Sequence, residues 1–416
     1  MNRFIIGVQI SFPLELIDEG IENSLNEMKK RGINTIFILT NIDYQDSSYW
    51  GELTHNPKRK KIVSSGFFYE PRSEYYKNTK IKPIKTNDPI LKNIDILNEV
   101  IKLAHGEDIK CYAFILNRIP FSEKYWNCFI RDVLNRPIPN VFCFNNPDVR
   151  NLYYGMIADL IENYDLDGIF LDLLDHSVQY GFKKLPDELV EIVGSIEIEK
   201  AEMGLTCFCE HCKKIAKERN IDLYKIKKGL IQGVKLGLIP EKVQKLSTVD
   251  EVMDLLIEVP EYFEWLRFKA ECLSEFHAEL YGLAKSLNRK VEVALDIYGP
   301  SESWKYASDF HSLSKHCDWI KPMFYSGTYP ALPLTPEKIY SEVKKAIEKV
   351  NGRVDIVAGI NAIGVSPKYV KESVVQSLKA GSKGVIISWD YGLIPFENMD
   401  AAKEGILEVK EKIKDF

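Results

Sequence analysis

Short, nearly continuous runs of apolar residues recur along the chain, and each is followed by a polar loop and a helical pattern. Eight runs can be counted, at residues 4–11, 35–41, 110–116, 168–175, 291–298, 319–326, 355–363 and 384–390. They are rich in Ile, Val, Leu and Phe, as expected of parallel strands that are buried on both faces. The pattern predicts an α/β protein built on eight buried strands.

Between these runs, apolar residues recur at helical spacing, for example at 21–31, 94–104, 149–163, 339–350 and 367–380. Eight strands that alternate with helices are typical of a (β/α)₈ TIM barrel. A doubly wound open sheet would alternate in the same way. No Gly-x-Gly-x-x-Gly follows any of the strands, however, and eight is the number of strands in a closed TIM barrel. We therefore expect a closed barrel.

Two connections are much longer than a loop and a helix require. We expect a single TIM-barrel domain over residues 1–416, with an insertion at 42–108 after strand two and a helical, cysteine-containing insertion at 176–264 after strand four. The first insertion carries the basic run 58–61, interpreted as a solvated loop. Since strand-to-helix loops build the active face of a barrel, its aromatic residues are of interest for that face: Tyr44, Tyr49, Trp50, Tyr69, Tyr75 and Tyr76.

Composition narrows the class of protein. The chain is 45% hydrophobic and its net charge is −5, which argues against a disordered chain and against a broad electrostatic footprint for nucleic acid. No apolar stretch approaches the roughly 20 residues of a membrane span. The opening run Phe4–Val8 is broken by Gln9 and is too short for the core of a signal peptide. We expect a cytoplasmic protein without nucleic-acid or membrane partners, and the oligomeric state stays open, a homo-oligomer included.

Acidic residues stand at the ends of several predicted strands, where a TIM barrel carries its active face. Burying a carboxylate without a partner costs several kcal/mol, so aspartates inside apolar runs are informative. Four of them are candidate catalytic residues: Asp172 and Asp175 after strand four, Asp296 after strand five, and Asp390 after strand eight.

Asp172 and Asp296 form the favoured pair. The period of two places Asp172 on one strand face with Phe170, and Asp296 on one face with Glu292. Two acids from adjacent strands at one barrel mouth are what acid and base chemistry on a glycosidic bond requires, one ionised and the other protonated. The alternative for any single strand-end aspartate is a helix cap or a pair with a buried Arg or Lys.

Several segments resemble a group of glycoside-hydrolase barrels that are distantly related to the α-amylase superfamily. An Asn-Pro-x-x-Arg helix start at 146–150 leads into the strand Asp-Gly-Ile-Phe-Leu-Asp at 167–172, and similar later signatures lie at 265–268, 309–314, 317–325 and 384–389. The resemblance covers residues 105–395. It implies a barrel, a carbohydrate substrate, and Asp172 as the nucleophile. The α-amylase pattern has a Glu as the acid/base on strand five, where this chain has Asp296, so Asp175 and Asp390 stay open as alternative proton donors.

Aromatic residues follow the same strand ends. Flat rings offer a large apolar area that suits the faces of pyranose rings, although aromatic residues at a barrel mouth also pack beneath long loops. Trp389 and Tyr325 stand at predicted strand ends. The candidate substrate-binding residues are Tyr298, Trp304, Tyr325 and Trp389.

Three of the eight cysteines crowd into six residues, as Cys207, Cys209 and Cys212. Thiolates spaced in this way can fold around one tetrahedral Zn²⁺. The motif resembles the zinc cluster of some β-galactosidases, in which a distant fourth cysteine completes the site. Four residues are open as the fourth ligand: Cys143, Cys272, Cys128 and His211. A closed four-ligand site is structural and would hold the second insertion over the barrel mouth, whereas an open three-ligand site would invite catalysis on a metal-bound water. We expect the structural role.

Three functions follow from these features. The first is a glycoside hydrolase that cleaves an O-glycosidic bond with Asp172 as nucleophile and Asp296 as acid/base. The second is a non-catalytic carbohydrate-binding protein on a degenerate glycosidase barrel. The third, less favoured, is a zinc-dependent hydrolase. The sequence leaves open which sugar and linkage are recognised, and whether the reaction retains or inverts the anomeric configuration.

Overall fold

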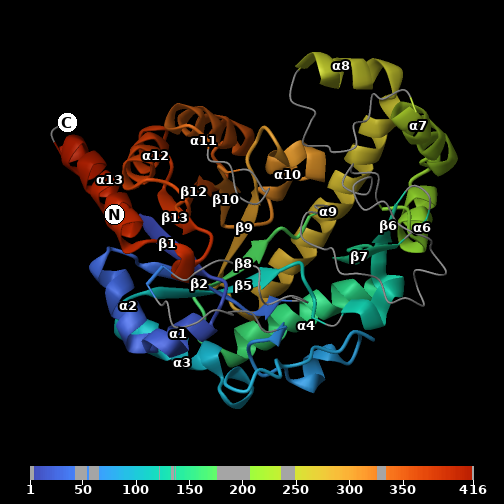
Figure 1. Ribbon diagram of the computed structural model, residues 1–416. Coiled ribbons are helices and arrows are strands. Elements are labelled where there is room, and N and C mark those ends of the chain that lie inside the picture. The colour runs from blue at the N-terminus through green and yellow to red at the C-terminus, as the bar shows by residue number, and fades with distance from the viewer. Residues whose placement is uncertain are drawn as a thin grey trace.

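A closed barrel of parallel strands forms the centre of the molecule (Figure 1). The structure is a computed structural model that describes residues 4–42, 54–55, 65–120, 122–132, 135, 137–175, 207–235, 249–325 and 334–414. Within these residues, the barrel strands in chain order are β1 (Ile5–Ile10), β2 (Thr35–Leu39), β5 (Lys110–Leu116), β8 (Gly168–Asp172), β9 (Glu292–Tyr298), β10 (Trp319–Met323), β11 (Asp355–Ile356) with β12 (Ala358–Asn361), and β13 (Gly384–Ser388).

Each barrel strand pairs in parallel with the next, and two pairings close the ring: β1 with β13, and β9 with β10. β11 and β12 together make the seventh of the eight strands, because both pair with β10. The predicted (β/α)₈ TIM barrel is thereby confirmed, and all eight apolar runs contain a barrel strand.

Helices surround the barrel and return the chain from each strand to the next (Figure 1). Proline at the first turn and a capping side chain fix several of their starts. Ser366, for example, accepts a hydrogen bond from the backbone N–H of Tyr369 and precedes Pro367, the first residue of its helix. The helices of the ring are α1 (Leu14–Glu19), α2 (Ile21–Lys30), α3 (Ile96–Gly106), α4 (Pro147–Asn163), α9 (Pro260–Leu287), α10 (Phe310–Leu313), α11 (Pro336–Val350), α12 (Pro367–Lys379) and α13 (Phe396–Lys414).

The connection after strand two runs across α4. Its tyrosines Tyr69 and Tyr76 are buried and bonded to each other through their hydroxyls, and the Tyr75 hydroxyl donates to Glu162 of α4. These three aromatic residues therefore pack against a helix. Tyr44, Tyr49, Trp50 and the basic run 58–61 lie outside the described residues.

The connection after strand four carries α6 (Glu210–Glu218), α7 (Leu223–Lys235) and α8 (Val249–Glu258) before it enters the long helix α9. Figure 1 shows α7 and α8 standing away from the barrel, beside the end of α9 where that helix begins. The sequence pattern missed a further element after strand three, the antiparallel hairpin of β6 (Phe129–Arg131) and β7 (Pro137–Phe142).

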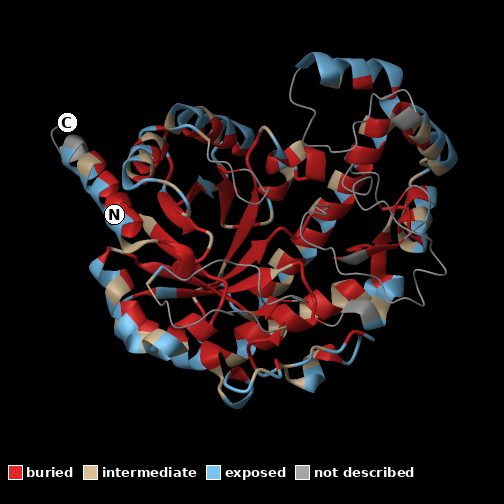
Figure 2. Cartoon of the chain, viewed as in Figure 1, coloured by how far each residue is buried: buried red, intermediate tan, exposed pale blue. Residues whose placement is uncertain are grey.

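Aromatic side chains fill the barrel interior. Phe37 lies with its ring centroid 4.4 Å from that of Phe170, and both approach Trp319. Glycines make room for these rings, because a Cβ on Gly168 would lie 2.1 Å from the ring of Tyr112. The strands are buried along almost their whole length, while the outer helix faces are exposed (Figure 2). The barrel is thus a packed core.

A second, smaller hydrophobic core lies in the insertion. It joins residues of β6, β7, α6, α7, α8 and α9 with Phe208, which lies just before α6 and stacks on Trp265 of α9 with ring centroids 4.4 Å apart. In the described part of the chain, no helix combines the length and the apolar composition that a membrane span requires.

Candidate functional site

Asp172 and Asp296 lie side by side at the carboxyl end of the barrel. Asp172 ends β8 and is the direct register partner of Asp296 in β9. Register partners on neighbouring parallel strands share one face and lie about 4.8 Å apart. Both residues are buried, with 7% and 1% of their surface exposed. In the described part of the chain, the Oδ1 atom of each has no hydrogen-bond partner, so the two carboxyl groups retain an oxygen for an incoming group.

Lys321 of β10 completes this polar layer, and the sequence interpretation missed it. Its Nζ lies 2.7 Å from Oδ2 of Asp296, 3.2 Å from Oε1 of Gln9 and 3.0 Å from the hydroxyl of Tyr325. The lysine is completely buried. Its stem passes over Gly359, where a Cβ would lie 2.5 Å from Cε of Lys321. The signal was present in the sequence, because a lysine inside an apolar strand needs a partner as much as an aspartate does.

Burial and mutual repulsion perturb both carboxyl groups. Burial raises the pKa of Asp172 well above its usual range, and the neighbouring charge of Asp296 raises it further. Burial also raises the pKa of Asp296, to about 6, while the Lys321 ammonium opposes that rise. The pKa of Lys321 itself is raised by Asp296 and Tyr325 despite its burial. Burial and the charge of Asp296 therefore favour the neutral form of Asp172, whereas the Lys321 ammonium favours the ionised form of Asp296.

The two remaining candidate aspartates occupy different places. Asp175 is buried, accepts a hydrogen bond of 3.2 Å from Ser308, and raises the pKa of both Asp172 and Asp296 through its charge. It thus belongs to the same mouth as the pair. Asp390 instead accepts from the backbone N–H of Ser11 at 2.8 Å, with the side chains of Glu15, Glu19 and His55 as its neighbours. Burial raises the pKa of Asp390 to about 7.

Three of the four aromatic candidates lie together, and the fourth, Trp389, lies elsewhere. Tyr298, Trp304 and Tyr325 line one pocket of about 1100 Å³ beside the ends of β9 and β10. Tyr298 stacks on Tyr306, with centroids 4.2 Å apart, and Tyr325 bonds Lys321. Trp389 is half-buried after β13, on a cis peptide bond with Ser388, and is not among the residues that line this pocket.

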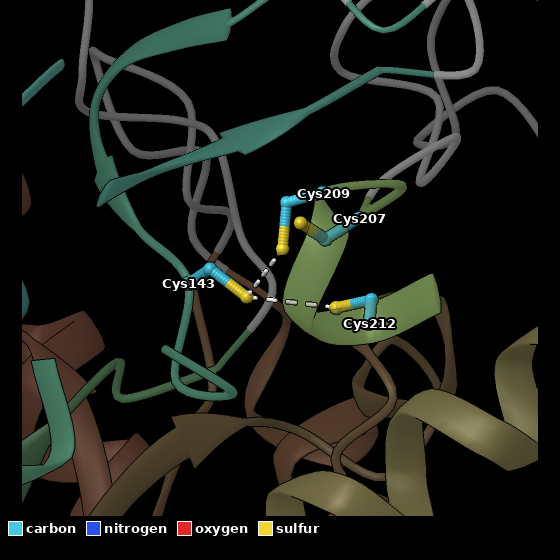
Figure 3. Close-up of side chains that lie close together, drawn as sticks. All are labelled: Cys143, Cys207, Cys209 and Cys212. Atoms are coloured by element: carbon cyan, nitrogen blue, oxygen red, sulfur yellow. Dashed lines mark hydrogen bonds between the residues drawn. The ribbon is translucent and has the colours of Figure 1, made fainter. Parts of the chain in front are cut away.

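Four buried cysteines converge between the β6–β7 hairpin and the start of α6 (Figure 3). The sulfur of Cys143, just after β7, lies 3.5 Å from those of Cys209 and Cys212, and all four sulfurs, including that of Cys207, lie within 4.8 Å of one another. A tetrahedron with metal–sulfur bonds of about 2.3 Å puts its sulfurs about 3.8 Å apart, so the cluster could bind one metal ion. Of the four candidates for the fourth ligand, Cys143 joins the group, whereas Cys128, Cys272 and His211 do not.

Hydrogen-bond donors surround the sulfurs. The side-chain amide of Asn145 donates to Cys212 at 3.3 Å, and the backbone N–H of Arg131 donates to Cys207 at 3.4 Å. Such outer contacts orient metal ligands and stabilise thiolate charge. The donor set is thus four sulfurs with supporting N–H groups.

No family model and no curated protein sequence matches this chain. Solved structures resemble it in fold. The glycoside hydrolase domain of PgaB (BpsB) from Bordetella bronchiseptica has a TM-score of 0.60 at 11% identity, over 97% of this chain and 98% of that domain. The catalytic domain of β-amylase from Paenibacillus polymyxa has a TM-score of 0.54 at 11% identity, over 98% and 99%.

A third similar structure is α-L-fucosidase isoenzyme 2 from Paenibacillus thiaminolyticus, with a TM-score of 0.55 at 14% identity. The match covers 99% of this chain and 50% of the fucosidase, so the chain spans half the length of that protein. At these identities the likeness shows a shared TIM-barrel fold, on which many chemistries occur.

Proposed function

We propose that the protein is a glycoside hydrolase that cleaves an O-glycosidic bond between the carboxyl groups of Asp172 and Asp296. One observation carries the proposal: two register-paired, buried aspartates at the active end of a TIM barrel, each with an oxygen that has no partner in the described part of the chain. Three structures of similar fold come from carbohydrate-active enzymes, which supports a carbohydrate substrate.

The electrostatics of the pair favour a division of roles. Asp172, whose neutral form is favoured by burial, is suited to protonate the leaving oxygen, while Asp296, beside the Lys321 ammonium, is suited to attack the anomeric carbon or activate a water. This reverses the division that the sequence resemblance implies, in which Asp172 is the nucleophile and Asp296 the acid/base. Asp175 remains close enough to influence either group.

Leaving-group dependence tests both points. Wild-type protein, Asp172→Asn and Asp296→Asn are compared on a panel of 4-nitrophenyl glycosides and on natural oligosaccharides. An acid is dispensable when the leaving group is good, so Asp172→Asn should keep most activity on the aryl glycosides and lose it on natural linkages. Asp296→Asn should lose both. The opposite result would restore the division from the sequence, and full activity of both variants would refute the proposal.

One observation favours a second candidate, a non-catalytic carbohydrate-binding protein. The ion pair between Lys321 and Asp296 is what a purely structural partner of a buried aspartate would form. Under this alternative, the wild-type protein binds oligosaccharides but hydrolyses no member of the panel.

We further propose that Cys143, Cys207, Cys209 and Cys212 bind one structural Zn²⁺. Four sulfur ligands leave no open coordination position, which argues against the zinc-dependent hydrolase. When bound, the ion would supply a rigid link between the β6–β7 hairpin and α6. Metal analysis of purified protein should find about one zinc per chain, and its absence after growth in zinc-replete medium would refute this.

A further inference from the structure

The pocket of about 1100 Å³ has walls from two parts of the fold. One wall belongs to the barrel, where Tyr298, Tyr325 and Met323 stand at or just beyond the ends of β9 and β10. Another wall combines Met253 of α8, which belongs to the insertion, with Leu266 of the ring helix α9. The pocket is therefore completed by the insertion.

This pocket adjoins the carboxyl pair. Tyr298 follows Asp296 by two residues on β9, and the Tyr325 hydroxyl bonds the same lysine that holds Asp296. A molecule bound between the two aspartates can therefore extend into the pocket. Its volume reaches the upper end of the roughly 300–1,000 Å³ of small-molecule sites, which leaves room for more than one sugar ring.

The lining combines ring faces with neutral polar groups. Tyr298 and Tyr306 form one stacked pair, the half-buried Trp304 lies near them, and Ser303 and Ser308 add hydroxyl groups. Aromatic faces bind the apolar faces of sugar rings, and hydroxyls bind their edges.

The charged residues of the pocket are paired with protein groups. Glu342 accepts from Ser301 and lies 3.1 Å from Lys345 and 3.4 Å from Lys338. Lys349 donates to the backbone oxygen of Pro300. Arg267 pairs with Glu271. Three of the four pocket cations, Lys338, Lys345 and Arg267, thus lie beside carboxylates of the protein, which disfavours a substrate that carries carboxylate or sulfate groups.

We propose that this pocket is a subsite for the sugar rings of a neutral oligosaccharide that lie beyond the bond cleaved between Asp172 and Asp296. The inference rests on the proposed function. It adds the substrate class: a neutral chain of several sugars, preferred over a single sugar with a small leaving group. The insertion takes part in binding because it supplies one wall.

Chain-length dependence tests the subsite. The probes are the 4-nitrophenyl monosaccharide that wild-type protein hydrolyses and the two- to six-sugar series of that sugar. Wild-type kcat/KM should rise with chain length. Trp304→Ala should lower kcat/KM on the pentasaccharide by about 10- to 100-fold, as expected for the loss of a large aromatic contact, and leave the aryl monosaccharide within about twofold.

Two further variants serve as a control outside the pocket and as a second test within it. Trp126→Ala removes an exposed tryptophan that does not line the pocket and should change neither rate. Met253→Ala alters the insertion wall at a half-exposed side chain, so it should fold even if Trp304→Ala does not, and should slow only the longer chains. Equal loss on all substrates, no dependence on chain length, or a preference for acidic oligosaccharides would overturn the subsite.

Binding separates this inference from the proposed function. If wild-type protein hydrolyses no glycoside, the proposed function fails, and the subsite is then tested by calorimetric titration with cellopentaose, maltopentaose and chitopentaose. Binding of one of them that is lost in Trp304→Ala and kept in Trp126→Ala supports the subsite. Binding of none of them overturns it.

Discussion

At the scale of single residues, Lys321 is the residue that connects the polar side chains at the carboxyl end of the barrel. It contacts groups from three other places, because Asp296 belongs to β9, Gln9 to β1 and Tyr325 to the segment after β10. Gln9 in turn accepts from the hydroxyl of Ser388 on β13. Removing one member of a buried ion pair typically costs about 3–5 kcal/mol, because the other charge stays buried without compensation. The lysine therefore both holds the layer together and sets the charge of Asp296.

Replacement of Lys321 should move the pH dependence of activity. The ammonium lowers the pKa of Asp296 toward the value of about 6 that the folded protein has. In Lys321→Met that pKa rises, so Asp296 becomes ionised only at higher pH, and the acidic limb of kcat/KM against pH should shift upward. The exposed Lys29→Met is the control. An unchanged acidic limb in a folded Lys321→Met would show that Asp296 does not act as the ionised group.

His277 should make the stability depend on pH. This buried residue of α9 donates from Nε2 to the backbone oxygen of Leu174, and burial lowers its pKa to about 4. In the unfolded chain the imidazole of His277 binds a proton near pH 6.5, whereas in the folded protein it does so only near pH 4. The free energy of unfolding therefore falls as pH decreases through this window, by up to about 3 kcal/mol.

Urea denaturation of wild-type protein and His277→Gln at several pH values between 7.5 and 4.5 measures how much of the pH-dependent fall in the free energy of unfolding comes from His277. Buried carboxyl groups with raised pKa, such as Asp296 and Asp390, act in the opposite direction, so the difference between the two proteins is the quantity to compare. Parallel curves would contradict the assignment.

At the scale of elements, the cysteine cluster joins pieces that are distant in the sequence. Cys143 follows β7 and lies 69 residues before Cys212 of α6. The local spacing of three cysteines predicted a metal site, but the fourth ligand could not be chosen from the sequence. The fourth cysteine of the cluster, Cys143, follows a hairpin whose short strands left no recognisable apolar run, so only the tertiary arrangement brings it to the other three.

Loss of one cysteine should loosen the insertion and spare the barrel. Metal-binding energy is also folding energy, and the cluster lies within the small core that holds α6 and α7. Cys209→Ser should lose the zinc and exchange its amide hydrogens faster in α6, α7 and α8, while the barrel strands stay protected. Cys317→Ser, a buried cysteine outside the cluster, is the matched control and should retain the metal. Faster exchange throughout both cores would contradict this independence.

At the scale of the whole molecule, the barrel could be predicted because its strands are buried on both faces and therefore read as apolar runs. The pair of Asp172 and Asp296 followed from the same rule, since a charge inside such a run is conspicuous. The pocket could not be predicted in this way. Its walls come from α8, α9 and the loop after β9, and nothing in their amphipathic patterns states which residues face one another across a gap.

The substrate is expected to cross the barrel mouth from Trp389 to Trp304. β13, which precedes Trp389, lies three strand spacings from β9, or about 14 Å along the barrel wall, whereas Trp304 lines the pocket beyond β9. Trp389→Ala should weaken oligosaccharide binding by about 1–3 kcal/mol. Because substitutions more than about 7–10 Å apart usually act independently, the losses in the double variant with Trp304→Ala should add on a five- or six-sugar chain. On a disaccharide, which is too short to reach both, the double variant should lose no more than the worse single variant. Calorimetric titration of wild-type protein, the two single variants and the double variant measures these losses of binding free energy. Full affinity in a folded Trp389→Ala would assign Trp389 to packing alone.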